Sequence, residues 1–227
     1  SRPFASVHEY YDKATPPDFF SVNLIEWHQI PTDMQELPCP TIGFTNDFDM
    51  HIQGMHRWLA PFDCRVVIDH VVELPKVQNI TGSPTITYPM VFGIPDDMPP
   101  LNADRPHDID VFFSGTLVSG YHPDKERFLF QLFSNKSADV LLIDGHLSVD
   151  RYLDILSRSK ITPSYCRHPG GIQTRVIESL CMGSLAMVQP ESIMHLWAGE
   201  DDGLFTFNED EGPGPTIERI LANYGKY

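Results

Sequence analysis

The chain reads IDVFFSG from Ile109 to Gly115, and the fold class can be inferred from this stretch and its surroundings. Its apolar, β-branched and aromatic residues lead directly into a glycine turn, which is typical of a buried strand. Residues 125–133 (KERFLFQLF) follow with apolar positions at helical spacing, and residues 140–143 (VLLI) indicate the next strand. Strand, helix and strand in this order predict a βαβ unit and therefore a parallel sheet.

The same alternation continues toward the C-terminus. Helical segments are expected at 149–159, 173–182 and 216–223, and strands at 161–164 and 185–188. In an open parallel sheet, ligands bind outside the carboxyl ends of the strands. The sequence therefore places three loops around one cleft: 115–121, 164–174 and 189–193.

The N-terminal part repeats this rhythm less regularly. Strands are expected at 19–27, 39–44, 64–68 and 84–92, with a helix at 51–59. The stretch that follows is rich in proline and polar residues, as linkers are. We therefore expect an α/β fold with a partial or minimal N-terminal α/β domain over 1–95, a linker over 96–108, and a Rossmann-like C-terminal domain with a parallel sheet over 109–227.

Composition and charge narrow the range of functions. The 227 residues are 41% hydrophobic and 21% charged, as in ordinary globular proteins, so the chain can bury a core. Acidic residues outnumber basic ones by 31 to 16, which gives a formal charge of -15. This balance argues against nucleic acid or an anionic membrane as a partner, because both need clustered Lys and Arg. A small anionic ligand is still possible, since one local positive spot or a helix N-terminus is enough.

The sequence also indicates a compartment. No apolar run approaches the roughly 18 residues of a transmembrane helix, and no signal-peptide pattern is present, so a cytoplasmic protein is expected. The chain opens Ser-Arg-Pro without Met, which predicts a processed chain, a cut domain or a start partway into a longer protein. The four cysteines and ten histidines show no zinc-ligand spacing, so we expect free thiols and no metal site.

The densest chemical signal lies at residues 164–183. Here Gly170 and Gly171 open a helix, and a glycine pair lets backbone N–H groups approach a phosphate closely. Thr174 can cap this helix or bond a phosphate oxygen. The stretch therefore favours an anion site at the start of the helix.

Arg175 and Glu178 stand three positions apart, one helical turn, on the same face. The arginine can make a charge-assisted contact to a diphosphate. The glutamate can accept hydrogen bonds from two vicinal hydroxyls, as a ribose presents them. The alternative interpretation is structural: the two side chains form a solvated ion pair, and the glycine pair is only a tight turn.

The same stretch resembles the donor-nucleotide signature of GT-B glycosyltransferases, with Arg-x-x-Glu, a Cys-x-Gly helix end and then an apolar strand. Three blocks in order resemble the spore-maturation, CgeB-like group of these enzymes. They are DVFFSG from Asp110, YLDILSRSKI from Tyr152, and the helix from Arg175 to Gly183. The resemblance extends over 109–223 and, more weakly, over 18–93.

This resemblance implies a GT-B-like fold and a nucleotide-sugar donor, such as a UDP- or GDP-sugar, held by the C-terminal domain without a further cofactor. Glu178 would hold the ribose and Arg175 the diphosphate. The other donor-binding positions would be Gly115, Thr116, Gly170, Gly171, Gln173 and Thr174. Many retaining members place a basic pair after the first glycine turn, and Lys125 and Arg127 are its nearest candidates here. The acceptor would be a glycan, a protein or a small molecule.

Two residues are candidates for catalysis. Asp47, in the motif Asp47-Phe48-Asp49, would lie on the acceptor side, where a carboxylate could act as general base on a hydroxyl. An Asx turn after a strand explains the same residue as well. His168 stands beside the glycine pair, where its imidazole could contact a phosphate or a sugar hydroxyl.

Two other functions stay open at this point. A GT-B-like domain could have lost activity and serve as a binding or scaffold module of a larger protein. Alternatively, Asp47 and Asp49 with nearby histidines could form a metal-dependent hydrolase, although the chain shows no recognised set of metal ligands.

Overall fold

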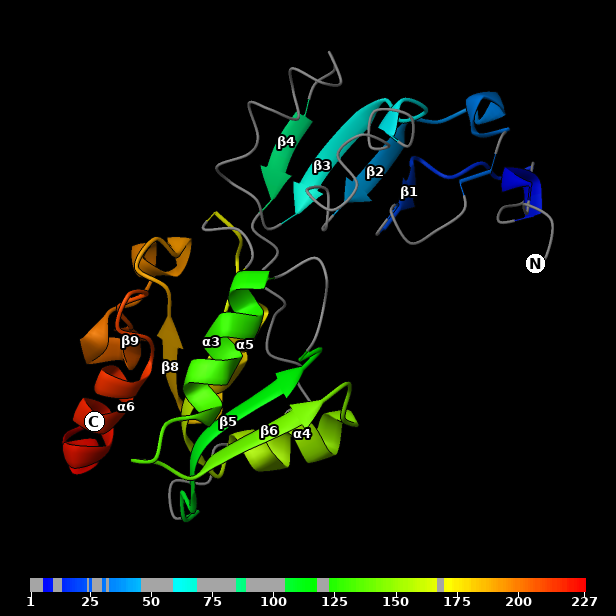
Figure 1. The fold of residues 1–227 in the computed structure, drawn as a ribbon. Helices are drawn as coiled ribbons and strands as arrows, with labels where there is room; N and C mark the ends of the chain where they lie inside the picture. Colours follow the sequence, from blue (N-terminus) through cyan, green and yellow to red (C-terminus); the bar gives the residue numbers. More distant parts are fainter. Residues whose placement is uncertain are drawn as a thin grey trace. The chain divides into compact units, whose positions relative to one another are not determined.

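A computed structural model gives the structure of the chain (Figure 1). It describes residues 6–9, 14–23, 25, 30–31, 33–45, 59–68, 85–88, 105–117, 123–166 and 170–227. The chain divides into two compact units, Ser1–Met90 and Val91–Tyr227. Both contain a parallel sheet, and the α/β fold expected from the sequence is confirmed. The expected linker over 96–108 is described only from Arg105 onward, so its boundaries stay a prediction.

The first unit contains a four-stranded parallel sheet. Its strands are β1 (Phe20–Val22), β2 (Thr41–Thr45), β3 (Cys64–Ile68) and β4 (Thr85–Tyr88), in the order β1-β2-β3-β4. Two 3-10 turns, η1 (Val7–Glu9) and η3 (Met34–Glu36), precede β2. The core of this unit is a buried apolar cluster of Val7, Ile25, Met34, Leu59 and Phe62.

Packing in this unit explains two details of its strands. β1 is shorter than the strand expected at 19–27, because the chain leaves the sheet after Val22 and Ile25 is buried in the apolar cluster instead. On β2, Gly43 lies against the ring of Phe62, and a Cβ at this position would meet ring atom Cδ2 at 2.7 Å. Asp47 and Asp49 lie outside the described residues. So does the helix expected at 51–59, of which only Leu59 is described.

The second unit contains a five-stranded sheet in which every pair is parallel. Its strands are β5 (Ile109–Gly115), β6 (Val140–Asp144), β7 (Ser159–Pro163), β8 (Leu185–Val188) and β9 (Leu204–Thr206). The first four were expected from the sequence. β9 was missed because it has only three residues, too few to show a strand period.

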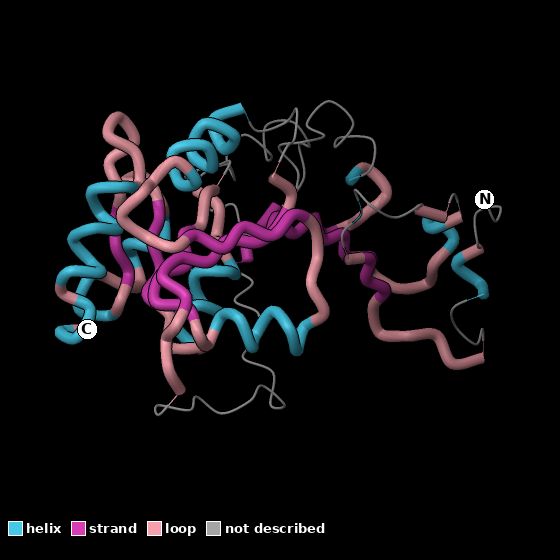
Figure 2. Tube along the Cα trace, turned by 60° about the horizontal axis from the view of Figure 1, so that its bottom comes forward, coloured by secondary structure: helices cyan, strands magenta, loops and turns pink. Residues whose placement is uncertain are grey.

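Helices cover both faces of this sheet (Figures 1 and 2). They are α3 (Pro123–Phe133), α4 (Val149–Leu156), α5 (Thr174–Cys181) and α6 (Gly214–Ala222). Residues from α3 and α6 pack in one core with Phe113, whereas α4 packs with the preceding strand residue, Phe112. α5 packs with Ala186 and Val188. Successive residues of a strand point to opposite faces, so helices on both faces explain why Phe112 and Phe113 are both buried.

The strand order of the second unit contains a topological switch point, where successive connections leave the sheet in opposite directions. The strands lie in the order β6-β5-β7-β8-β9, so the chain leaves β5 on one side for β6 and then returns past β5 to β7. The loops that follow β5 and β7 therefore diverge at neighbouring carboxyl ends, after Gly115 and Pro163. In open α/β sheets this divergence opens the crevice in which ligands bind.

Candidate anion site at the end of strand β5

Arg175, on the first turn of α5, extends over the carboxyl end of β5. Its Cζ lies 4.8 Å from the centre of the Phe113 ring. The next strand residue on the same face is Gly115, and a Cβ there would stand 3.3 Å from Arg175 Nη2. Gly115 also has a φ of +126°, a backbone conformation that L side chains rarely adopt. The glycine therefore provides both the turn after β5 and the space for the guanidinium.

Lys125 brings a second positive charge to the same place from α3. Its Nζ lies 5.4 Å from the centre of the Phe113 ring and donates a hydrogen bond of 2.5 Å to the carbonyl oxygen of Thr116. Burial, and then the charge of Arg175, lower the pKa of Lys125, while Asp144 raises it. Two cations from helices on opposite faces of the sheet thus meet at one strand end.

Neither cation is neutralised by a close acid. Within the part of the chain that the structure describes, no carboxylate oxygen lies within 4 Å of a side-chain nitrogen of Arg175 or Lys125. The Nε of Arg175 is buried and has no hydrogen-bond partner. In a chain with a formal charge of -15, such a pair of uncompensated cations is what an anionic ligand requires.

Glu178 does not pair with Arg175, although the two residues are one turn apart on α5. Its Oε2 instead accepts a hydrogen bond of 2.7 Å from the hydroxyl of Tyr152 on α4. Burial and the negative charge of Glu178 raise the pKa of Tyr152, and Arg175 opposes them. The alternative of a solvated Arg–Glu pair therefore does not describe this helix face.

The start of α5 lacks a side-chain cap. Gln173 is the N-cap residue and its side chain makes no bond to the first turn, so Thr174 is the first helical residue and not the cap. Gln173 is 7% exposed; its Nε2 lies 3.5 Å from Ser192 Oγ, and its buried Oε1 has no hydrogen-bond partner. The N–H of Val176 bonds the Gln173 carbonyl at 3.0 Å, so the N–H groups of Thr174 and Arg175 are the ones that could meet a ligand.

Gln189 fixes the loop that leads from β7 to α5, a role that the sequence analysis missed. Its Oε1 accepts a bond of 2.7 Å from the backbone N–H of Cys166, and its Nε2 donates one of 2.9 Å to the Cys166 carbonyl. His195 Nε2 lies 3.3 Å from the carbonyl oxygen of Gln189 and 3.2 Å from Thr206 Oγ1. A polar residue directly after a fully buried strand is the signal that could have identified Gln189.

The structure brings several of the expected donor-binding residues together. Gly115, Thr116 and Arg175 meet at the end of β5, with Thr174 beside Arg175 in the first turn of α5. Gly170 and Gly171 are buried just before the helix. His168 and Asp47, the expected catalytic residues, lie outside the described residues.

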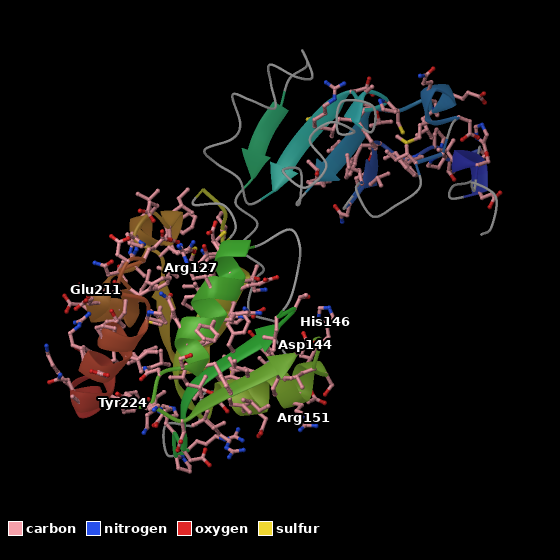
Figure 3. The ribbon with its side chains drawn as sticks, in the orientation of Figure 1. Arg127, Asp144, His146, Arg151, Glu211 and Tyr224 are labelled. Atoms are coloured by element: carbon pink, nitrogen blue, oxygen red, sulfur yellow. The ribbon has the colours of Figure 1, made fainter. Side chains whose placement is uncertain are left out.

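Of the two basic residues considered for the site, only Lys125 reaches it. Arg127 is exposed and lies 3.7 Å from Asp124 one turn away, as an ordinary surface pair does. Figure 3 labels Arg127 on α3 and Asp144 on β6. Asp144 accepts a bond of 3.0 Å from the backbone N–H of Leu117, which fixes the loop after β5. Across the described residues, no group of His, Cys, Asp and Glu is arranged to hold a metal ion.

Comparison with known proteins gives a distant structural likeness. Neither a family model nor a curated protein matches the chain. A solved structure, the crystal structure of a GtfA/B complex, is similar with a TM-score of 0.45 and 10% sequence identity. The likeness covers 85% of this chain and 47% of that chain, so this chain spans about half the length of the protein it matches. Among the described residues, no helix combines the length and the apolar character needed to cross a membrane.

Proposed function

We propose that the second unit binds a nucleoside-diphosphate sugar and that the protein transfers the sugar to an acceptor hydroxyl, as a member of the CgeB-like glycosyltransferases. One observation carries the proposal: Arg175 and Lys125 converge, without a close acid, at the end of β5. They do so at the switch point of the sheet, beside the uncapped start of α5. A diphosphate supplies the negative charge that would compensate these two cations.

Each residue has a chemical task in this proposal. Arg175, Lys125 and the first N–H groups of α5 bind the diphosphate, and they stabilise the charge that grows on it as the sugar–oxygen bond breaks. Glu178 keeps one carboxylate oxygen, Oε1, for a ribose hydroxyl, since Tyr152 already bonds Oε2. Thr116 and the glycines give the backbone close access to the phosphates.

Two proposed catalytic roles rest on the sequence alone. Asp47 would act as general base on the acceptor hydroxyl, and His168 would contact a phosphate or a sugar hydroxyl near the glycine pair. The acceptor is a glycan, a protein or a small molecule. Whether the donor is a UDP- or a GDP-sugar is a matter for experiment.

Calorimetry with UDP and GDP tests the binding site. Arg175→Ala and Lys125→Ala are each expected to weaken binding of the preferred nucleotide by about ten- to a hundredfold, since each removes a charge-assisted hydrogen bond. Arg151→Ala is the matched control, because Arg151 is an exposed cation on α4 of the same unit (Figure 3). Equal binding by all four proteins would refute the site.

Turnover is a separate question. A panel of nucleotide sugars should include one from which the protein releases UDP or GDP, and the Asp47→Asn variant should release less. Tight nucleotide binding without release from any donor would instead favour a binding or scaffold module that keeps the fold and the anion site.

A further inference from the structure

Arg175 and Glu178 should attract each other, yet both side chains interact with the hydroxyl of Tyr152 without forming an ion pair with each other. Opposite charges three positions apart on a helix are neighbours and usually pair. Here no ion pair within 4 Å joins them in the described structure: the guanidinium lies over Phe113, and the carboxylate bonds Tyr152. Some contact outside α5 must therefore compete for one of the two side chains.

Tyr152 provides that competing contact. Its hydroxyl donates to Glu178 Oε2 at 2.7 Å, a bond to a charged acceptor that is stronger than a neutral one. Its ring lies 6.1 Å from that of Phe112, and its helix is held by the buried Leu153 and Leu156. The hydroxyl thus comes from a rigid position, and it interacts with the side chains of both Glu178 and Arg175.

From this geometry we infer that Tyr152 is a positioning residue: its hydroxyl takes the place of a direct Arg175–Glu178 ion pair and so leaves the charge of the guanidinium to an anionic ligand. Without the hydroxyl, the carboxylate loses its partner on α4, and the nearest cation on its own helix face is Arg175. An ion pair between them would neutralise half of the positive charge at the end of β5. The inference rests on the proposed anion site and adds the residue that keeps that site charged.

Inorganic diphosphate is the probe, because it lacks the ribose that Glu178 is proposed to hold. Calorimetry on the full chain compares wild type with Tyr152→Phe, Glu178→Gln and the double variant. Tyr152→Phe should bind about three- to fivefold more weakly, the loss expected when a partly exposed ion pair must be broken. Glu178→Gln removes a negative charge beside the site and should bind more tightly than wild type.

The double variant separates positioning from packing. If Tyr152 acts through Glu178, the double variant binds as tightly as Glu178→Gln, because the glutamine cannot form an ion pair with Arg175. Equal binding by Tyr152→Phe and wild type would overturn the inference. A double variant as weak as Tyr152→Phe would do so too, since it would mean that the lost hydroxyl damages the structure itself.

A measurement without ligand keeps the inference distinct from the proposed function. The interaction between positions 175 and 178 is obtained from urea unfolding of Arg175→Gln, Glu178→Gln and their combination. The two positions should be nearly independent in the wild-type background and clearly coupled in the Tyr152→Phe background. If coupling appears only in the Tyr152→Phe background but wild type does not bind diphosphate, the anion site is refuted and the role of Tyr152 stands. Equal coupling in both backgrounds would refute the role of Tyr152 alone.

Discussion

The guanidinium of Arg175 lies over the ring of Phe113, with its Cζ 4.8 Å from the ring centre. The two residues come from different layers of the second unit, α5 and β5, and they meet at the carboxyl end of the sheet. A cation over an aromatic face is held in place without being neutralised. The contact therefore orients Arg175 and leaves its charge available to a ligand.

Gly115→Ala should damage both the fold and the anion site. The left-handed φ of Gly115 is unfavourable for alanine, and its new Cβ would stand 3.3 Å from Arg175 Nη2. We expect a loss of roughly 1–3 kcal/mol in the free energy of unfolding, measured with urea. Binding of UDP or GDP should weaken at the same time. Gly225→Ala is the control, because a Cβ at Gly225 meets no atom within 4 Å; a loss as large in that variant would contradict the explanation.

Lys125→Met should raise stability while it weakens binding. Burial and Arg175 lower the pKa of Lys125, so the ammonium is less favourable in the folded than in the unfolded chain. This cost is full below the lowered pKa and fades as the pH rises from that pKa to the one of the unfolded chain. The methionine variant should therefore unfold at a higher urea concentration at pH 7, and nucleotide should bind it about ten- to a hundredfold more weakly. A variant that binds as wild type does would remove Lys125 from the site.

Gln189→Ala should loosen the loop before α5. The side chain makes two bonds to the backbone of Cys166, and its removal leaves both backbone groups without these partners. The free energy of unfolding should fall by about 1–3 kcal/mol. Glu191→Ala, at an exposed position two residues after Gln189, serves as the control. If both variants unfold alike, Gln189 does not fix the loop.

His107 should make the second unit sensitive to mild acid. Its Nδ1 shares a hydrogen bond with the hydroxyl of Tyr224, and burial, followed by the charge of Lys160, lowers the pKa of His107. Burial also raises the pKa of Tyr224 to about 12, so this hydroxyl stays a neutral donor. A lowered histidine pKa gives stability that is present above the unfolded value and lost as the pH falls through the folded one.

Urea unfolding at pH 7 and pH 5 tests this. Wild type should lose more stability between the two pH values than His107→Asn does. His146→Asn is the matched control, because His146 is exposed beyond β6 (Figure 3). It should follow the wild-type curve, and a flattened curve for His146→Asn but not for His107→Asn would contradict the assignment.

The strands that the sequence predicted best are those with a buried apolar run that ends sharply. The bounds of β5 and β8 agree with the expectation to the residue, because glycine or serine flanks a buried apolar run. The end of α5 was also predictable, since Gly183 adopts a φ of +78° just after the helix. β1 was not, because Ile25 packs into the apolar cluster and not into the sheet, and no local pattern distinguishes these two outcomes.

The site was predictable in part for a similar reason. Arg175, Gly115 and the start of α5 could be placed together because the carboxyl ends of parallel strands share one edge of the sheet. The link between Tyr152 and Glu178 could not be predicted, since it joins residues of different helices and depends on their side-chain directions. Lys125 was one of two basic candidates on the same helix, and only the packing of α3 decides between it and Arg127.

The meeting of Lys125 and Arg175 also has a consequence for the empty protein. Two like charges, one on each side of the sheet, push α3 and α5 away from the strand end that they share. Without an anion, the first turns of these helices should open more often than the rest of the second unit, and their amide hydrogens should exchange faster with solvent. In the proposed function, a bound diphosphate would turn this repulsion into attraction, so that the two helices would close on the ligand together.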